Sequence, residues 1–264
     1  MTPNASPRSS LLAESLLFAG RHANHWRNMP AIPIQSLLLP TLLLIVYYLL
    51  VGESMVAISG TDNLQALVPM CALAGGMFGA LGAGFSVPFE RASGLLSRWW
   101  TFPVHRASVI VGRLIAEAVR TLVAAGLITA VGVALGLRFA GGWLAVIPFL
   151  LVPVLVVLVF STVILTFALS AGPNVNAVFT YLATGSVGMV FASSGVAPVG
   201  MYPSWMQPLI QYQPMSAAID SMRAFVEGTS PVMPLTLTIV WFLAFAAVFG
   251  PLAVRRYRLA AESG

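Results

Sequence analysis

Long runs of apolar residues, separated by short polar stretches, are the dominant pattern of this sequence. A helix of about 20 consecutive apolar residues crosses the hydrocarbon core of a bilayer. The first run begins only near residue 32 and is long enough to span, so we interpret it as a retained helix rather than a signal peptide. We predict an all-α integral membrane protein, a single transmembrane domain over residues 1–264, with six spans at about 32–52, 64–88, 109–137, 143–169, 175–194 and 232–254.

Residues 10–28 precede the first span and carry apolar side chains at helical spacing. The stripe consists of Leu12, Leu16, Ala19, Ala23 and Trp26. Such a segment, with polar residues off the stripe, is typical of an amphipathic helix that lies in the membrane interface. A loosely ordered tail is the alternative.

Composition narrows the classes of function. Charged residues make up 8% of the chain and hydrophobic residues 58%, whereas a soluble domain has about 25% charged residues. The basic residues are thirteen arginines and no lysine, which excludes a P-loop lysine and a lysine Schiff base. Cys71 stands alone, and the three histidines have no partners at metal-ligand spacing. We therefore expect no catalytic, metal-binding or cofactor-binding residues.

The arginines predict how the spans are oriented. In a six-span arrangement, eleven of the thirteen fall on one side of the membrane, and only Arg138 and Arg223 fall on the other. Cytoplasmic loops are enriched in basic residues. Both termini are therefore predicted to be cytoplasmic.

The second connection, residues 89–106, reads FERASGLLSRWWTFPVHR and is more charged than its surroundings. We predict a short helix from about Glu90 to Trp100, ended by Pro103. It would carry Ala92, Leu95, Leu96 and Trp99 on one side and Arg91 and Arg98 on the other. The alternative is that the tryptophans belong to an interfacial belt and the arginines only set topology.

Two further charged sets stand out. Arg113, Glu117 and Arg120 share one helical face near the predicted cytoplasmic edge of span three, where the glutamate can pair with either arginine. They form either a charged cytoplasmic gate, a brace, or simply an ion-paired helix start. Asp220 and Arg223 form a plausible pair after span five.

Residues 195–230, before span six, are too polar and too rich in proline for a straight span. We predict one or two short helices that enter the membrane from the far side as a re-entrant hairpin, which requires cover from protein or a water-filled cavity. Within span two, Gly75, Gly76, Gly79 and Gly82 permit close helix approach and predict a helix–helix contact.

Two motifs resemble those of a known family. FERASGLLSRWWTFPVHRASVIVGR is similar to a glutamate-led loop ending in T-P-V-x-R, here with Phe102 inserted. MYPSWMQPLIQYQPMSAAIDSMR is similar to P-x-W-x-Q-P … N-P-x-x-x-x-x-D-x-x-R, with Gln213 where asparagine is common. The matching positions are Pro203, Trp205, Gln207, Pro208, Pro214, Asp220 and Arg223. The chain thus resembles ABC-2 type ABC transporter permeases, most closely the daunorubicin-resistance type of actinobacteria.

The resemblance implies a permease that exports a lipid or lipophilic drug across the plasma membrane and has no enzymatic activity of its own. It implies a separate ABC ATPase that binds ATP and Mg²⁺, a second permease half, identical or homologous, and no nucleic-acid partner. Residues 89–106 would then couple to the ATPase. The residues assigned to this coupling are Glu90, Arg91, Leu95, Leu96, Arg98 and Trp99.

Two other classes of function remain open. An ion-coupled secondary transporter often carries mid-span acidic residues and inverted repeats, but only Glu117 approaches that description and no repeat is evident. A membrane enzyme would need a catalytic constellation. Spans four and five carry hydroxyl and amide side chains without histidine or carboxylate, so a hydrolytic site is difficult to build there.

Overall fold

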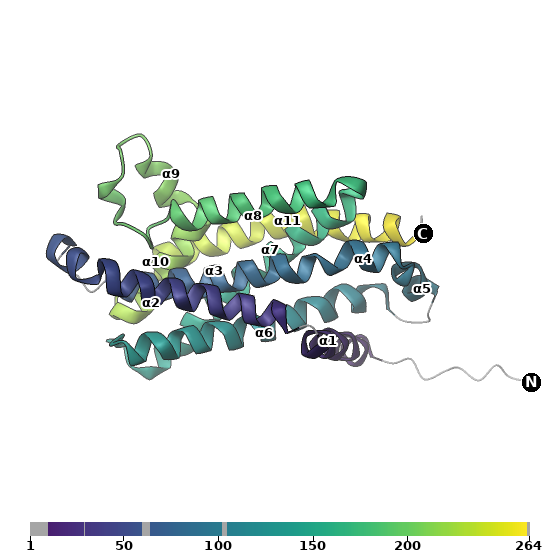
Figure 1. Ribbon diagram of the computed structural model, residues 1–264, viewed down its shortest axis with the longest axis horizontal. Coiled ribbons are helices and arrows are strands. Elements are labelled where there is room, and N and C mark those ends of the chain that lie inside the picture. The colour runs from purple at the N-terminus through teal and green to yellow at the C-terminus, as the bar shows by residue number, and fades with distance from the viewer. Residues whose placement is uncertain (1–9, 29, 60–63, 102–104, 263–264) are drawn as a thin grey trace, which may run out of the picture.

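The computed structural model describes residues 10–28, 30–59, 64–101 and 105–262 (Figure 1). Their regular secondary structure is entirely helical, which confirms the predicted fold class. The long helices lie lengthwise beside one another (Figure 1). They are α2 (Ala31–Ser59), α3 (Leu64–Gly84), α6 (Arg106–Ala134), α7 (Val146–Ser170), α8 (Val175–Phe191) and α11 (Val232–Glu262).

These helices coincide with the six predicted apolar segments. By length and apolarity, four stretches of the described residues could cross a membrane, namely Leu64–Ala92, Ala107–Ala134, Trp143–Ser170 and Val232–Glu262. Ser36–Leu50 and Val175–Phe191 are shorter apolar helices. The helical segments are therefore confirmed, whereas six crossings stay a prediction.

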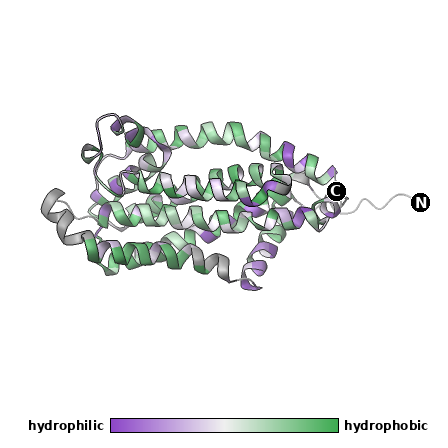
Figure 2. Cartoon of the chain, turned by 45° about the horizontal axis from the view of Figure 1, so that its top comes forward, coloured by the Kyte–Doolittle hydropathy of each residue, from purple (hydrophilic) through white to green (hydrophobic). Residues whose placement is uncertain are grey.

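The shorter elements gather at the two ends of the bundle. One end, the terminal end, carries α1 (Leu11–Asn28), α4 (Ser86–Ala92), α5 (Leu95–Thr101) and the C-terminal part of α11. The other, the hairpin end, carries η3 (Val199–Met201), α9 (Gln207–Tyr212) and the start of α10 (Pro214–Glu227). Apolar residues dominate the long helices between them, and hydrophilic residues are concentrated toward the ends (Figure 2).

Helix α3 lies at the centre of the bundle, and its glycines explain how. A Cβ added at Gly75 would lie 2.7 Å from the Ser36 carbonyl oxygen of α2. A Cβ at Gly76 would lie 2.5 Å from a methyl of Val157 on α7. Only glycine allows neighbours this close, so the expected helix–helix contact of the glycine run is confirmed at these positions.

The predicted N-terminal helix is present as α1 and packs against α6, where Gly112 meets Phe18 and the Ser15 carbonyl. Its buried residues include Glu14 and His22. The predicted apolar stripe mostly faces away from the bundle, because Leu12 and Leu16 are exposed. The helix therefore turns polar side chains toward the protein and leucines outward.

The single helix predicted for residues 90–100 is wrong, because the chain breaks there into α4 and α5. Gly94 adopts a left-handed conformation, φ 66°, which residues with a Cβ rarely adopt. The Ser93 and Gly94 amides donate to the Phe89 and Arg91 carbonyls and close α4. Pro88 does not end span two as predicted but lies in the first turn of α4, where its missing N–H costs nothing. Pro103 lies outside the described residues.

Candidate functional site

Helix α5 is held against the bundle through the aromatic ring of Trp99. The Phe18 ring packs edge-on at 5.6 Å between centroids, and the Arg21 guanidinium lies 4.3 Å from the Trp99 ring centroid. Leu96 is buried beside Trp99. Of the residues predicted to contact an ATPase, these two therefore face the chain itself, whereas Arg98 is exposed and Leu95 half-buried.

The charged residues of α4 also contact the rest of the chain. Glu90 pairs with Arg113 at 3.5 Å and with Arg21 at 3.9 Å. Arg113 in turn donates to the Ala83 carbonyl at 2.6 Å, near the end of α3. Arg91 donates to the Leu169 carbonyl at 3.0 Å near the end of α7. Cations near helix C-termini satisfy the unpaired carbonyls, so α4 is fixed to two long helices.

Two polar residues of α1 complete the terminal end. A Glu14 carboxylate oxygen accepts from the His105 backbone N–H at 2.7 Å, at the N-terminus of α6, where negative charge is favourable. Burial, with Arg113 and Arg21 nearby, lowers the pKa of His22 to about 3. His22 is therefore neutral at pH 7 and adds no charge beside the arginines.

The predicted charged set on α6 is divided between two places. Arg113 pairs with Glu90, whereas Glu117 pairs with Arg120 at 2.6 Å, and both side chains of that second pair are 3% exposed. Arg120 also donates to the Gly76 carbonyl at 3.1 Å. Its Nη1 has no hydrogen-bond partner among the described residues and lies where a Cβ of Gly79 would be.

The Glu117–Arg120 pair is deeper than the sequence suggested. Arg120 follows the first residue of α6 by fourteen positions, a rise of about 21 Å along the axis. The pair therefore lies inside the bundle, between α6 and α3, and not at the start of a helix.

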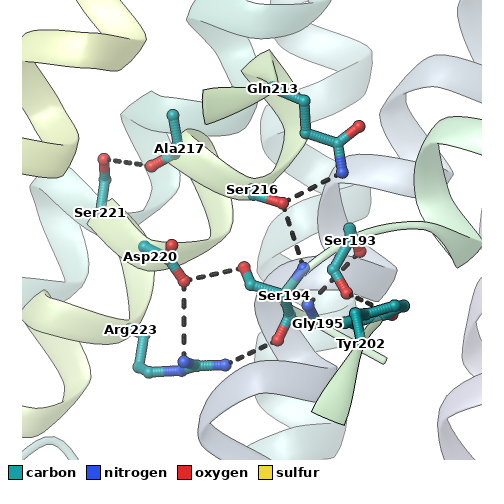
Figure 3. Close-up of polar contacts among 10 residues, drawn as sticks. All are labelled: Ser193, Ser194, Gly195, Tyr202, Gln213, Ser216, Ala217, Asp220, Ser221 and Arg223. Atoms are coloured by element: carbon teal, nitrogen blue, oxygen red, sulfur yellow. Dashed lines mark hydrogen bonds and ion pairs between the residues drawn. The ribbon is translucent and has the colours of Figure 1, made fainter. Parts of the chain in front are cut away.

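At the hairpin end, Asp220 and Arg223 bind the turn that follows α8 (Figure 3). The carboxylate of Asp220 accepts from the Ser194 hydroxyl at 2.8 Å and pairs with Arg223 at 3.6 Å. Arg223 donates to the Ser194 carbonyl at 3.0 Å, and the Ser194 N–H donates to the Ser216 hydroxyl at 3.1 Å. Helix α10 therefore clamps the polar groups of this turn, and the predicted Asp220–Arg223 pair is confirmed.

The remaining hairpin residues brace the same region. Tyr202 donates to the Ser193 carbonyl at 3.1 Å, and the Gln213 side-chain amide donates to the Ala192 carbonyl. Gln207 donates to the Tyr202 carbonyl at 2.9 Å, whereas Trp205 is 70% exposed. The other matched residues are Pro203, whose carbonyl accepts from the next turn, and Pro214, in the first turn of α10.

We expect Asp220→Ala to loosen the clamp and lower the midpoint of thermal unfolding by about 3 °C or more. The variant removes a charged acceptor and leaves Arg223 without its ion pair, a loss of about 1–3 kcal/mol, and 1 kcal/mol shifts Tm by about 2–4 °C for a chain of this size. Glu227→Ala, on the same helix, is the control and should shift Tm by under about 1 °C. Equal shifts for the two variants would contradict the clamp.

Comparison with known proteins agrees with this arrangement of helices and hairpin. The family model for the ABC-2 type transporter matches residues 15–226. The chain belongs to the ABC-2 type transporter family. That match includes α4–α5, the Glu117–Arg120 pair and the α10 clamp, so each is a feature of an ABC-2 permease.

Curated relatives give the family its context. This permease is 32% identical over 244 residues to the "probable doxorubicin resistance ABC transporter permease protein DrrC" of Mycobacterium tuberculosis, covering 92% of this chain and 88% of the relative. It is 25% identical over 251 residues to the "daunorubicin resistance ABC transporter permease protein DrrB1" of Streptomyces coeruleorubidus, covering 95% and 88%. The putative transport permease ycf38 of Cyanophora paradoxa is 24% identical over 77% of this chain and 71% of that protein.

Sequence reasoning missed several residues that the structure brings into these clusters. Glu14 and His105 are ninety-one positions apart, so no local pattern reveals their contact. The serines of the turn at 193–194 carried no signal except that they follow an apolar run.

Proposed function

We propose that this chain is the permease half of an ATP-driven exporter that moves a lipophilic drug or lipid across the plasma membrane. ATP, with Mg²⁺, would be bound and hydrolysed by a separate ABC ATPase. The observation that carries this proposal is the family match, together with relatives named for doxorubicin and daunorubicin resistance. The absence of lysine from this chain is in line with borrowed ATP hydrolysis.

The proposed topology has six crossings and cytoplasmic termini. It is supported by the lengthwise course of α2 and α8 beside the four strongly apolar helices (Figure 1). The distribution of arginines also supports it, because α4, α5 and the end of α11 are at one end whereas Arg138 and Arg223 are toward the other. The terminal end is then the cytoplasmic end.

In this topology the α4–α5 segment is the proposed docking surface for the ATPase. Its buried residues, Leu96 and Trp99, would hold the segment in place. Its exposed residues, Phe89, Ala92 and Arg98, would contact the partner. The coupling role assigned to Glu90 and Arg91 is then indirect, because their contacts lie within this chain. Leu95 is half-buried at the border between the two groups.

A second permease half, identical or homologous, is proposed to pack against the outward faces of α2 and α8. On α2 the exposed residues include Leu38, Leu42 and Leu49. On α8, exposed small residues such as Gly188 lie beside Tyr181 and Val187. Small residues permit close approach of helices in membranes, which favours α8 as part of this contact.

Of the three roles open for the charged set on α6, a brace is best supported. Glu117 and Arg120 bind each other and the Gly76 carbonyl, and they are buried inside the chain. Arg113 ties α6 to Glu90 and α3. An ion-coupled secondary transporter, the alternative function, would need an acidic residue free to exchange an ion, and Glu117 is engaged by an arginine.

Purification of the tagged chain from its native membrane tests the proposal. We expect an ABC ATPase and a second permease copy to co-purify, and the isolated chain to have no ATP hydrolysis. Proteoliposomes containing the whole complex should transport only with ATP. Transport driven by an ion gradient without nucleotide, and without an ATPase in the complex, would contradict the proposal and favour the secondary transporter.

A further inference from the structure

A hollow of about 370 Å³ lies between α7, α8, α10 and α11, and we refer to it as the α8 hollow. Met77 of α3 forms part of its wall. The other lining residues are Leu155, Val156, Val159, Phe160 and Val163 of α7, Tyr181, Leu182, Gly185, Ser186 and Met189 of α8, Pro214 and Met215 of α10, and Thr238, Trp241, Phe242 and Phe245 of α11.

The hollow exists because α8 is held near its two ends. Toward the terminal end, the Phe179 ring stacks on Phe85 at 4.1 Å between centroids. At the hairpin end, the α10 clamp binds Ser194 in the turn after α8 (Figure 3). Between these anchors Gly185 has no neighbouring atom within 4 Å of where a Cβ would be. Helix α8 thus bridges a gap that its own side chains do not fill.

The chemistry of the wall selects an uncharged occupant. None of the described lining residues is charged, and the buried polar atoms are already bonded within the chain. Ser186 donates to the Leu182 carbonyl at 2.7 Å, Thr238 to the Pro234 carbonyl at 2.9 Å, and the Trp241 indole to the Tyr212 carbonyl at 2.8 Å. A charged group placed here would lose its hydration without gaining a partner.

The shape of the hollow favours a small ring compound over a protein segment. An α-helix with its side chains is about 10 Å across, so the hollow would hold only roughly 5 Å of its length. Ligand pockets for small molecules are about 300–1,000 Å³. Phe160, Trp241, Phe242 and Phe245 offer flat apolar surfaces, and methionines add adaptable contacts.

We propose that the α8 hollow is a binding site for the transported substrate, an uncharged lipophilic ring compound taken from the bilayer. Calling the occupant a substrate rests on the export function proposed above. Tyr181, at the rim, is 77% exposed, and its hydroxyl makes no hydrogen bond within the described chain. It is placed to bond a polar substituent of the compound at the mouth.

The test uses the full chain purified into phospholipid nanodiscs, with pyrene as the probe and energy transfer from tryptophan as the readout. We expect saturable binding of pyrene. Gly185→Leu should weaken it at least about tenfold, because the new side chain extends into the hollow without a clash at its Cβ. Gly188→Leu is the matched control, since Gly188 is on the same helix, has equal space at its Cβ and does not line the hollow. Its affinity should equal that of the wild type.

Two further probes separate other occupants. Pyrenemethylammonium, the cationic counterpart, should bind at least about tenfold more weakly than pyrene. A phospholipid with pyrene on its acyl chain should give no saturable transfer. Equal binding by Gly185→Leu and wild type, equal loss in both glycine variants, equal affinity for the cation, or saturable binding of the labelled phospholipid would each overturn the proposal.

Binding and transport are separate readouts. Pyrene binding is measured on the permease alone, so it stands or fails independently of whether an ATPase co-purifies. If Gly185→Leu abolished binding but left ATP-driven transport by the complex unchanged, the hollow would not be a substrate site, whereas the proposed export function would stand.

Discussion

Glu117→Leu is expected to destabilise the protein by about 3 kcal/mol or more, because it leaves the Arg120 guanidinium charged and buried without its carboxylate. Arginine cannot lose its proton in a protein, so the structure has no inexpensive way to neutralise it. In a purified sample this should appear as a drop in the thermal midpoint on the order of 10 °C, with reduced yield from the membrane.

The reciprocal variant should cost less. Arg120→Leu leaves a carboxyl group that can take up a proton and become neutral, and the double variant Glu117→Leu/Arg120→Leu should recover much of the lost stability, since apolar residues replace the whole pair. Glu262→Leu removes an exposed ion pair with Arg258 and is the control. It should change stability by less than about 1 kcal/mol.

A second pair of variants tests the same contact from α3. Gly79→Ala would place a methyl where the Arg120 guanidinium lies, whereas Gly126→Ala on α6 would meet open space. The first should lower the thermal midpoint and the second should not. If Glu117→Leu and Gly79→Ala both behaved like their controls, the buried pair would not be a brace between α3 and α6.

The sequence was most informative where one local property decides the structure. Runs of apolar residues located the long helices, because burial or lipid contact along a whole helix requires a continuous apolar surface. The spacing of Asp220 and Arg223 was enough to predict their pair, since residues three apart on a helix are neighbours. The glycine run likewise indicated a close helix contact.

The contacts that could not be predicted depend on tertiary geometry. Glu117 had two arginines within helical reach, and the choice of Arg120 follows from Glu90, which holds Arg113 at the end of α3. The break at Gly94 depends on a left-handed conformation that glycine permits but does not require. The α8 hollow is a property of three-dimensional packing, and nothing in the order of its residues announces it.

Arg98→Glu is expected to reduce ATP-driven transport by at least about tenfold and leave the folded protein intact. Arg98 is exposed on α5, on the proposed docking surface. Reversing its charge would set like charges against an acidic partner surface, and about 1.4 kcal/mol already corresponds to tenfold in affinity. The measurement is retention of the ATPase during purification, together with transport by reconstituted complexes and the thermal midpoint of the permease alone.

Comparison variants decide whether this effect comes from docking. Leu96→Asp would be a poor test, because Leu96 is buried and its loss would unfold α5 before any partner is affected. Arg256→Glu makes the same charge change at an exposed position of α11, so it controls for attraction to anionic lipid and for membrane orientation. We expect it to retain the ATPase. An equal loss in both variants would show that general basic charge at this end, and not the α4–α5 segment, holds the partner. Normal transport by Arg98→Glu would mean that the ATPase does not depend on this residue, because a docking segment must present its exposed side chains to the subunit that drives it.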